Sequence, residues 1–330
     1  MTKVLVTRKV PDKFIQQLEE FADVKMWDEE FVPMPREKFL EEIKDAEAAF
    51  ITLSERIDEE TLEAAPNLKI VANMAVGYDN INIALAEEHG VTVTNTPGVL
   101  TETTAELGFT LMLATARRIV EAAKYIKDDE WKSWGPYLLA GKDVHGSNVG
   151  IFGMGDIGKA FARRLKGFEA NVMYHNRSRH RRAEKELGVL YVSFDELLEN
   201  SDFVVCTAPL TEETKDKFNA AAFKKMRNDA IFINIGRGAT VVEDDLLQAL
   251  KEGEIGGAGL DVFREEPIRA DHPLLQLPNV TALPHIGSAS VVTRDRMIQL
   301  SINNVKSVLQ GQPAITPAVS YTHLRAHETR

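Results

Sequence analysis

The sequence predicts an α/β protein made of two doubly wound parallel-sheet units. Short runs of β-branched and apolar residues alternate with amphipathic helical runs along most of the 330 residues, as in sheets whose parallel strands are joined by helices. A second series of strands starts at residue 148, and a long helical run follows the last strand. We therefore expect the second unit, residues 99–286, to be inserted into the first unit, residues 1–98 and 287–317.

The first unit is expected to hold four buried strands and an N-terminal helix. The helix, Pro11–Phe21, places apolar side chains on one face at helical spacing. An Asn-Thr-Pro-Gly turn at 95–98 ends this block. The four expected strands are Val4–Thr7, Ala48–Leu53, Ile70–Met74 and Val91–Thr94.

A long helix, Thr101–Arg118, leads into the second unit, and helical periodicity returns from Ser288 to Leu309. Between them we expect helices at Lys159–Lys166 and Glu243–Glu252. The expected strands are Asn148–Phe152, Asn171–Tyr174, Phe203–Thr207, Ala230–Asn234, Gly259–Val262 and Val280–Ala282.

Composition excludes several classes of protein. A formal net charge of −11 argues against a nucleic-acid binder, whose surface is densely basic. Cys206 is the single cysteine, so an internal disulfide and a cysteine-rich metal site are excluded, and a reducing cytoplasm is the expected compartment. The chain opens directly on a strand, so we expect no secretory leader. The longest apolar run, Leu107–Ala116, is too short to span a bilayer, so we expect no membrane association.

The C-terminal residues differ in character from the rest of the chain. His323 and His327 are four residues apart, a spacing that can place two metal ligands on one helix face, but no third ligand accompanies them. We therefore expect no metal site, and we expect residues 318–330 to be a disordered or appended tail outside the fold.

A glycine pattern, Gly-x-Gly-x-x-Gly, follows the strand at 148–152. Its context is that of a dinucleotide site, because an apolar strand precedes it and an amphipathic helix and another strand follow. The first glycine permits a tight turn, the second lets the backbone approach a pyrophosphate, and the third lets helix and strand pack closely. The helix N-terminus adds unpaired N–H groups and partial positive charge. The alternative is a glycine turn without a ligand. The predicted cofactor residues here are Gly153, Met154, Gly155, Asp156, Ile157 and Gly158.

The end of the next strand favours NADP over NAD. NAD sites carry an acidic residue about 20 positions beyond the glycine pattern, which binds the ribose 2′-hydroxyl. This sequence instead has Asn176, Arg177, Ser178 and Arg179 there. The two arginines could bind a 2′-phosphate through forked hydrogen bonds. We therefore expect NADP(H) to be preferred and keep NAD(H) as the alternative.

Three later strand ends each carry a residue suited to carbonyl reduction. Arg237 follows the strand that ends at Asn234, Glu266 follows the strand near 259–262, and His285 follows the last strand. Ligands of open α/β sheets bind at the carboxyl ends of strands. Glycines on both sides of Arg237 are expected to leave its guanidinium approachable. We predict that these three residues form a catalytic set, against the alternative of separate ion pairs and a packed histidine.

Together these motifs strongly resemble the D-isomer-specific 2-hydroxyacid dehydrogenase family. The resemblance covers residues 1–317 and rests on Gly153–Gly158, Asn234–Gly238, Asp261–Pro267 and Pro284–Ser288. Trp131–Pro136 and Gly141–Gly146 are similar to the glyoxylate/hydroxypyruvate (2-ketogluconate) reductase branch. The family implies a Rossmann-like nucleotide-binding domain inserted into a flavodoxin-like substrate domain. It also implies a homodimer.

The resemblance implies roles for individual residues. Arg237 would bind the carboxylate of a 2-oxo acid and polarise its carbonyl, with help from the N–H groups of Val76 and Gly77. His285 would donate the proton, and a neighbouring Glu266 would favour its imidazolium form. Asp261 resembles the residue that holds the nicotinamide amide. Trp134 would reach the partner subunit's active site, with local packing as the alternative. Further expected contacts are Thr207, Pro209, Ile235 and Gly287 with the cofactor, and Leu53 with the substrate.

The sequence therefore predicts NAD(P)H-dependent reduction of a small 2-oxo acid, glyoxylate or hydroxypyruvate, to the D-2-hydroxy acid. The same residues would serve a 2-ketogluconate reductase or a phosphoglycerate dehydrogenase. A different class also stays open, a cofactor-sensing binding protein similar to the co-repressors related to this family, because such proteins often keep the three catalytic residues.

Overall fold

The computed structural model describes residues 2–318 and divides them into two compact units. Unit 1 comprises the residues up to Leu100 and those from Ser290 onward, and unit 2 comprises Thr101–Ala289. These boundaries lie a few residues beyond the expected ones at 98/99 and 286/287. The segment around His285 stays with unit 2 because the N–H groups of His285 and Ile286 are bonded to Asp261.

The sheet of unit 1 has five parallel strands in the order β2-β1-β3-β4-β5. This is the flavodoxin-like order predicted for the first unit. Strand β2 was not predicted, because it lies at an edge and its sequence, Asp-Val-Lys-Met, alternates instead of forming an apolar run. The strands are β1 Lys3–Val6, β2 Asp23–Met26, β3 Ala48–Ile51, β4 Ile70–Asn73 and β5 Thr92–Thr94.

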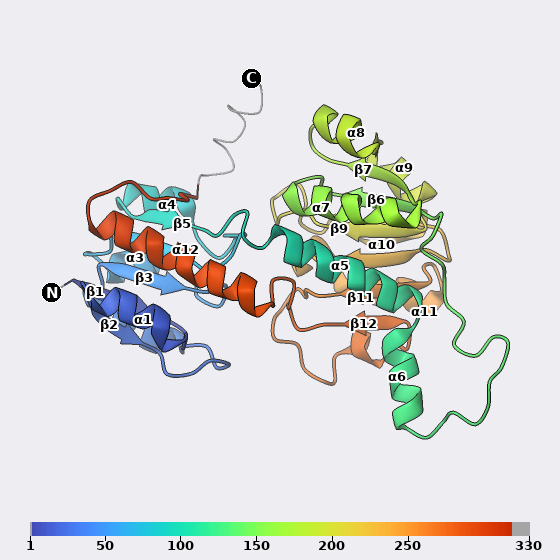
Figure 1. Ribbon diagram of the computed structural model, residues 1–330, viewed down its shortest axis with the longest axis horizontal. Helices are drawn as coiled ribbons and strands as arrows, with labels where there is room; N and C mark the ends of the chain where they lie inside the picture. The colour runs from blue at the N-terminus through green and yellow to red at the C-terminus, as the bar shows by residue number, and fades with distance from the viewer. Residues whose placement is uncertain (1, 319–330) are drawn as a thin grey trace. The chain divides into compact units, whose positions relative to one another are not determined.

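Helices cover both faces of this sheet, so its central strands are buried on both sides and are almost wholly apolar. Helices α1 (Asp12–Glu19) and α12 (Val291–Leu309) lie side by side on one face, although they come from opposite ends of the chain (Figure 1). The other face packs against α2 (Arg36–Glu42), η1 (Ile43–Asp45), α3 (Glu59–Ala64) and α4 (Ile83–Glu88).

The C-terminal end of unit 1 extends one residue further than expected. Ala318 was placed in the tail, yet it is buried and its N–H donates to the Val93 carbonyl at 2.8 Å. This short antiparallel pairing beside β5 holds it in the fold. The rest of the predicted tail, with His323 and His327, lies outside the described residues.

The sheet of unit 2 has seven parallel strands in the order β12-β11-β10-β9-β6-β7-β8. Counted from β6, this is the Rossmann order with one additional strand, so the predicted pair of doubly wound parallel sheets is confirmed. The strands are β6 Asn148–Phe152, β7 Asn171–His175, β8 Leu190–Tyr191, β9 Phe203–Cys206, β10 Ile231–Asn234, β11 Gly257–Leu260 and β12 Val280–Ala282.

Two apolar clusters cover the two faces of this sheet. One contains residues of α5 (Thr101–Ala116), α7 (Asp156–Leu165) and α8 (Arg181–Leu187). The other contains residues of α9 (Phe194–Asn200), α10 (Ala220–Lys225) and α11 (Glu243–Glu252). Three short 3₁₀ helices complete the unit: η2 Lys166–Phe168, η3 Gly238–Thr240 and η4 Pro273–Gln276.

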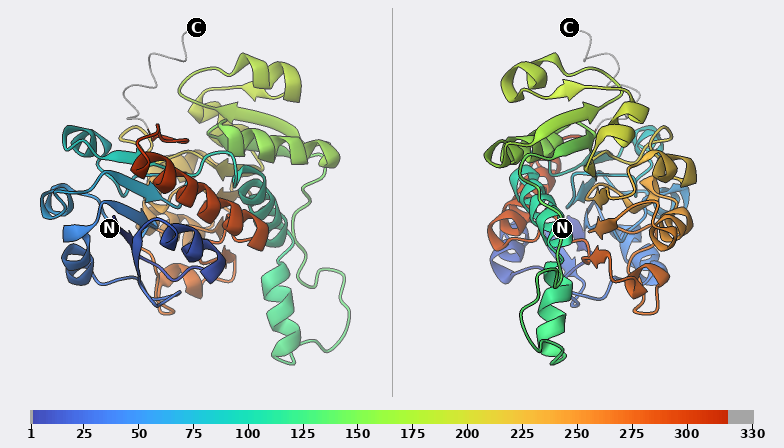
Figure 2. Two further views of the ribbon diagram at one scale, coloured as in Figure 1. Left: turned by 60° about the vertical axis from the view of Figure 1, so that its left-hand side comes forward. Right: turned by 90° about the vertical axis from the view of Figure 1, so that its right-hand side faces the viewer.

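Helix α6 (Ile119–Lys127) departs from this layered arrangement. None of its residues is buried, and both views of Figure 2 show this helix and the segment after it projecting from the sheet of unit 2. Its apolar side chains are therefore exposed, including Ile119, Val120 and Ile126. Among the described residues, no helix is long and apolar enough to cross a bilayer.

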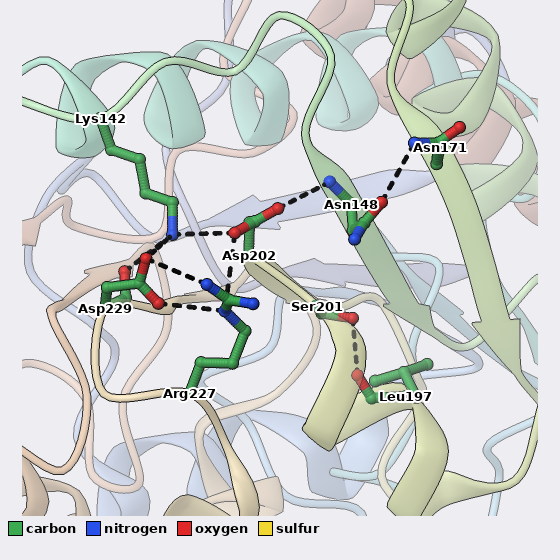
Figure 3. A network of polar contacts seen from close by, with 8 residues as sticks. All are labelled: Lys142, Asn148, Asn171, Leu197, Ser201, Asp202, Arg227 and Asp229. Carbon is green, nitrogen blue, oxygen red and sulfur yellow. Dashed lines mark hydrogen bonds and ion pairs between the residues drawn. The ribbon is translucent and has the colours of Figure 1, made fainter.

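A network of charges fixes the end of this projecting segment to the amino edge of the sheet (Figure 3). The Lys142 Nζ lies 2.8 Å from Asp229 Oδ2 and 3.1 Å from Asp202 Oδ1. Arg227 Nε lies 3.1 Å from Asp229 Oδ1, and the Asn148 N–H donates to Asp202 Oδ2 at 2.9 Å. The network therefore ties the chain before β6 to the segments that precede β9 and β10.

Candidate active site

The turn after β6 has the geometry that the glycine pattern predicts. Gly153 has φ +103°, and a side-chain Cβ there would lie 2.8 Å from the Ala208 backbone nitrogen. A Cβ on Gly158 would lie 2.2 Å from the Gly153 carbonyl oxygen. Thr207 Oγ1 donates to that same oxygen at 2.5 Å. The tight turn and the close packing of helix on strand are thus confirmed as the reasons for the first and third glycines.

The second glycine faces open space. A Cβ on Gly155 would meet nothing within 4 Å, and Gly155 is the N-cap of α7 with no side chain to occupy its first N–H groups. The backbone is therefore accessible to an anion at the positive end of a ten-residue helix. These residues fit a dinucleotide pyrophosphate, because the position that a Cβ would fill is the one that a phosphate needs.

The other predicted cofactor residues around this turn contribute through different atoms. Met154 and Ile235 are buried in the core of unit 2, so only their backbones can reach a ligand. The Ile235 side chain packs against Gly108 of α5, where a Cβ would lie 2.4 Å from Ile235 Cδ1. Asp156 is exposed and lies 2.8 Å from the Lys159 amine, and Pro209 is also exposed.

The segment after β7 presents two arginines in different situations. Arg177 and Arg179 are both exposed. Arg179 donates from Nε and Nη2 to the two carboxylate oxygens of Glu184, each at 2.7 Å, and this ion pair holds the pKa of Glu184 at about 2. The forked face of Arg179 is therefore used within the protein. Of the other two predicted residues in this segment, Asn176 is partly buried and Ser178 is exposed.

The loop after β10 carries Arg237 and is fixed by its glycines. A Cβ on Gly236 would lie 2.6 Å from the Ala208 carbonyl oxygen, and one on Gly238 would lie 1.8 Å from the Phe263 carbonyl carbon. Close backbone packing therefore requires both glycines, a role that the sequence did not predict. The contact at Gly238 brings the Arg237 loop against the segment that carries Glu266.

Glu266 and His285 form a direct pair. His285 Nδ1 lies 2.6 Å from Glu266 Oε2, and the Phe263 N–H donates to Glu266 Oε1 at 2.9 Å. Burial alone would raise the pKa of the Glu266 carboxyl, but the hydrogen bond to His285 and its charge outweigh burial, so this pKa lies below its ordinary value. Glu266 is therefore ionised at neutral pH and fixes the ring of His285. The Nε2 atom is the one left to act on a ligand.

The backbone around His285 is held by Asp261. The Asp261 carbonyl accepts from the His285 N–H at 2.9 Å, and its Oδ1 accepts from the Ile286 N–H at 2.8 Å. Burial raises the pKa of Asp261, while the Ile286 N–H opposes the rise. His285 has φ +53°, a left-handed conformation that is uncommon for a residue with a side chain. A Cβ on Gly287 would lie 3.2 Å from Asp261 Oδ2, so these two predicted residues are neighbours.

In unit 1, the loop after β4 holds the other predicted substrate residues. The Asn95 side chain donates to the Val76 carbonyl at 2.8 Å, and the Asn73 side chain donates to the Gly77 carbonyl at 3.0 Å. Within residues 2–318, the N–H groups of Val76 and Gly77 donate no hydrogen bond. The loop is thus held by its carbonyls and leaves two adjacent N–H groups for a carboxylate. Leu53 follows the neighbouring strand β3 and, like Val76 and Gly77, is half-buried.

Sequence reasoning missed two asparagines that shape these loops. Asn73 and Asn234 are each the last residue of a buried strand, and each is 1% exposed. Asn234 Nδ2 donates to the Arg237 carbonyl at 3.0 Å, as Asn73 does to the carbonyl of Gly77. A polar residue closing an apolar strand was the signal that could have identified both.

Two side chains outside these loops also received predictions. Trp134 is 77% exposed, so local packing does not account for it. Cys206 is fully buried in β9, and burial raises the pKa of its thiol to about 11. The thiol is therefore unreactive at neutral pH.

The carboxyl ends of the unit 2 strands thus lead into all three features: Arg237, the Glu266–His285 pair and the glycine cradle. An arginine can bind and polarise a carboxylate and a carbonyl, and an imidazole fixed by a carboxylate can transfer a proton. Beside a nicotinamide site, that combination is suited to reduction of a carbonyl compound.

Comparisons with known proteins agree with this geometry. Residues 109–287 match the family model of the D-isomer specific 2-hydroxyacid dehydrogenase NAD binding domain. A glyoxylate reductase of Korarchaeum cryptofilum is 47% identical over 94% of this chain and 93% of its own. The crystal structure of a Thermus thermophilus protein aligns with TM-score 0.90 and 40% identity over 96% of this chain and 100% of its own. An NADPH-dependent glyoxylate/hydroxypyruvate reductase of Sinorhizobium meliloti, solved with NADP and malonate, aligns with TM-score 0.84 and 34% identity over 96% of this chain and 97% of its own.

Sequence, fold and residue geometry lead to one assignment: this chain is an oxidoreductase that belongs to the D-isomer-specific 2-hydroxyacid dehydrogenase family.

Proposed function

We propose that this protein reduces glyoxylate or hydroxypyruvate to the D-2-hydroxy acid with NAD(P)H. The observation that carries the proposal is the His285–Glu266 pair at 2.6 Å. Both residues lie in segments that follow strands of the unit 2 sheet, and Arg237 and the glycine cradle lie in segments that follow other strands of the same sheet. Relatives of nearly full coverage that are named glyoxylate reductases support this choice of substrate.

The residues of the chain have distinct roles in this reaction. A nicotinamide cofactor held at the glycine cradle would supply the hydride for this reduction. Arg237 binds the substrate carboxylate and polarises the carbonyl through its planar cation. His285 donates a proton from Nε2 to the carbonyl oxygen, because its Nδ1 is engaged by Glu266. Asp261 keeps the backbone of this histidine in place and is a positioning residue as well as a neighbour of the nicotinamide amide.

In unit 1, Val76 and Gly77 supply backbone donors for the substrate carboxylate. Their N–H groups donate no hydrogen bond within residues 2–318, while the loop carbonyls are held by asparagines. Two adjacent N–H groups can bind both oxygens of a carboxylate without adding a charge. Leu53 contributes an apolar contact at the same edge of the sheet.

A direct assay tests this function. Loss of NADPH absorbance on addition of glyoxylate or hydroxypyruvate supports the proposal, with chiral analysis of the glycerate formed from hydroxypyruvate establishing the D configuration. Cofactor binding without turnover of either acid would favour the cofactor-sensing class instead. Faster turnover of 2-ketogluconate, or of 3-phosphohydroxypyruvate, would move the protein to one of the alternative dehydrogenases.

We extend the proposal to a preference for NADP(H). No carboxylate stands among residues 176–179 after β7, and Arg177 is an exposed cation in this segment. Arg177→Gln should raise KM for NADPH about tenfold or more and change KM for NADH little, because a charge-assisted bond to a 2′-phosphate is lost. Arg182→Gln, which removes an exposed arginine paired with Glu186, is the matched control. Equal or better wild-type efficiency with NADH would overturn the preference.

A cytoplasmic homodimer is the remaining part of the proposal. The single cysteine is buried and forms no disulfide, which suits a reducing compartment. Exposed apolar side chains of α6 and the segment after it, such as Ile126 at 62% and Trp134 at 77%, suit an interface between copies that brings Trp134 to a partner's active site. Ile126→Asp should convert a dimer into a monomer by light scattering. A monomeric wild type would contradict this part.

A further inference from the structure

The sheet of unit 1 has a topological switch point at which the proposed function uses only Leu53. In the order β2-β1-β3-β4-β5, neighbouring strands β1 and β3 lead in opposite directions from the point where they meet. In open α/β sheets, ligands bind outside the carboxyl ends of strands at such a point. Here the segments that leave β1 and β3 carry Thr7, Arg8, Ser54 and Glu55.

A buried carboxylate organises this point. The Glu55 side chain is 2% exposed, and its Oε2 accepts from Thr7 Oγ1 at 2.8 Å, from the Thr52 N–H at 2.8 Å and from Thr52 Oγ1 at 3.0 Å. Its Oε1 is buried without a hydrogen-bond partner in the described residues. The nearest cation to this oxygen is Arg8, whose Nη2 is 3.9 Å away. Partial burial of the Arg8 guanidinium is unfavourable because it removes water from a charged group. The buried Glu55 carboxylate offsets this unfavourable free energy.

The guanidinium itself is held in position but not saturated. The Arg8 side chain is 15% exposed, and Nη2 donates to Ser54 Oγ at 2.9 Å. Ser54 is the only hydrogen-bond partner that residues 2–318 give to this group, which has five N–H donors. None of the fully buried, partnerless side-chain atoms in those residues belongs to Arg8, so its other N–H groups are open to solvent. A positioned cation with open, forked donors is suited to a carboxylate or a hydroxyl oxygen.

The same edge carries the proposed carboxylate donors. Val76 and Gly77 follow β4, Leu53 follows β3, and Arg8 follows β1. Strand spacing places the first and last of these segments about 10 Å apart at the backbone. An arginine side chain and a three-carbon acid together span that distance.

We propose that Arg8 is a specificity-determining residue that binds the polar substituent on C3 of the substrate, the hydroxyl of hydroxypyruvate or a second carboxylate. This inference rests on the proposed function, in which C1 is bound at Val76 and Gly77. Glyoxylate has no C3, so Arg8 acts on the choice between acids and not on the chemistry at C2.

The test compares two substrates in one preparation of each variant. The readout is the ratio of kcat/KM for hydroxypyruvate to kcat/KM for glyoxylate, because a loss of folded protein lowers both terms equally. Arg8→Gln should lower this ratio about tenfold or more, the effect of losing a hydrogen bond to a charged group. Arg56→Gln, which removes an exposed arginine two residues beyond Ser54, should leave the ratio at the wild-type value.

Two further variants keep the test decisive if Arg8→Gln does not fold. Arg8→Lys retains a cation beside Glu55 but lacks the fork, and Ser54→Ala retains the charge pair but removes the anchor; both should lower the ratio. An unchanged ratio in the folded Arg8 variants would overturn the role of Arg8. A wild-type protein that reduces neither acid would overturn the proposed function, and the inference with it.

Discussion

The glycine cradle allows a test that separates cofactor binding from folding. Gly155→Ala adds a methyl group at a position where the protein itself has nothing within 4 Å. Gly155 has φ −73°, which alanine adopts without strain. Loss of an N-cap glycine costs up to about 1 kcal/mol, and the reduced freedom of the unfolded chain offsets about 0.4 to 1 kcal/mol. We therefore expect the melting temperature to change by no more than about 4 °C.

The same methyl group should interfere strongly with a dinucleotide. It stands between a pyrophosphate and the first N–H groups of α7, and each hydrogen bond to a charged group contributes about 1.5 to 3 kcal/mol. Weakening two such bonds should reduce the binding free energy of the dinucleotide by about 2 to 4 kcal/mol, which raises its Kd about 30- to 1,000-fold. Fluorescence titration with NADPH measures this Kd directly, without any substrate.

Gly167→Ala is the matched control for this experiment. Gly167 lies just beyond the other end of α7, and a Cβ there also meets nothing within 4 Å. We expect wild-type Kd from this variant. Gly158→Ala is unsuitable, because its Cβ would lie 2.2 Å from a backbone oxygen and would disturb the fold itself. Normal NADPH affinity in folded Gly155→Ala would refute the assignment of this turn as the phosphate site.

Four other expectations follow from the described geometry. His285→Ala should lower kcat on the order of 10²- to 10⁴-fold with little change in the Kd of NADPH, and a near-normal kcat would remove His285 from proton transfer. Glu266→Gln should lower kcat with little change in the Kd of NADPH, because the His285 ring loses the ionised carboxylate 2.6 Å away that fixes it; an unchanged kcat would argue against the pairing. Lys142→Met should lower the free energy of unfolding at pH 7 by about 1 kcal/mol, measured in urea, since its partners are partly exposed. Arg227 and, after it, Lys142 hold the pKa of Asp229 at about 2 against an ordinary 3.8, so the part of the stabilisation that Lys142 contributes is present above pH 4, and the difference from wild type should shrink as the pH falls toward 2. The Cys206 thiol, with a pKa of about 11, should resist iodoacetamide at pH 8 in the native protein, and rapid alkylation would show that β9 opens.

Local patterns predicted most of the architecture because parallel strands buried on both faces are short apolar runs. Strands such as β3 and β10 stand out for this reason, and their predicted ends differ from the observed ones by one or two residues. Strands β2 and β8 were missed because edge strands need no apolar run. The helix α7 begins three residues earlier than predicted, at Asp156, since its N-terminus carries polar and glycine residues that give no periodic signal.

The candidate site was predicted in its residues but not in the reasons for their arrangement. Arg237, Glu266 and His285 could be identified because each follows a strand end in a distinctive motif. The packing role of the glycines beside Arg237 was not predicted, since it comes from contacts with Ala208 and Phe263, which are distant in sequence. A contact of this kind leaves no periodic signal in the chain.

Arg179 illustrates the same limit for charges. As a residue after β7 it looked equivalent to Arg177, and only the fold shows that Glu184 binds both arms of its guanidinium. The partner of a charged side chain depends on which side chains the fold brings next to it. Here a glutamate in a helix, five residues further along the chain, binds the Arg179 guanidinium.

The amino-acid sequence by itself determined the two doubly wound sheets, the glycine cradle and the identity of the three catalytic candidates, because burial periodicity and backbone conformation are local properties. The tertiary structure alone decided which atoms are engaged and which stay available: Nδ1 of His285, the fork of Arg179, the N–H groups of Val76 and Gly77, and the guanidinium of Arg8. The physical reason is that hydrogen bonds and ion pairs depend on distances of a few ångströms between residues that lie from five to 46 positions apart, and chain folding sets those distances.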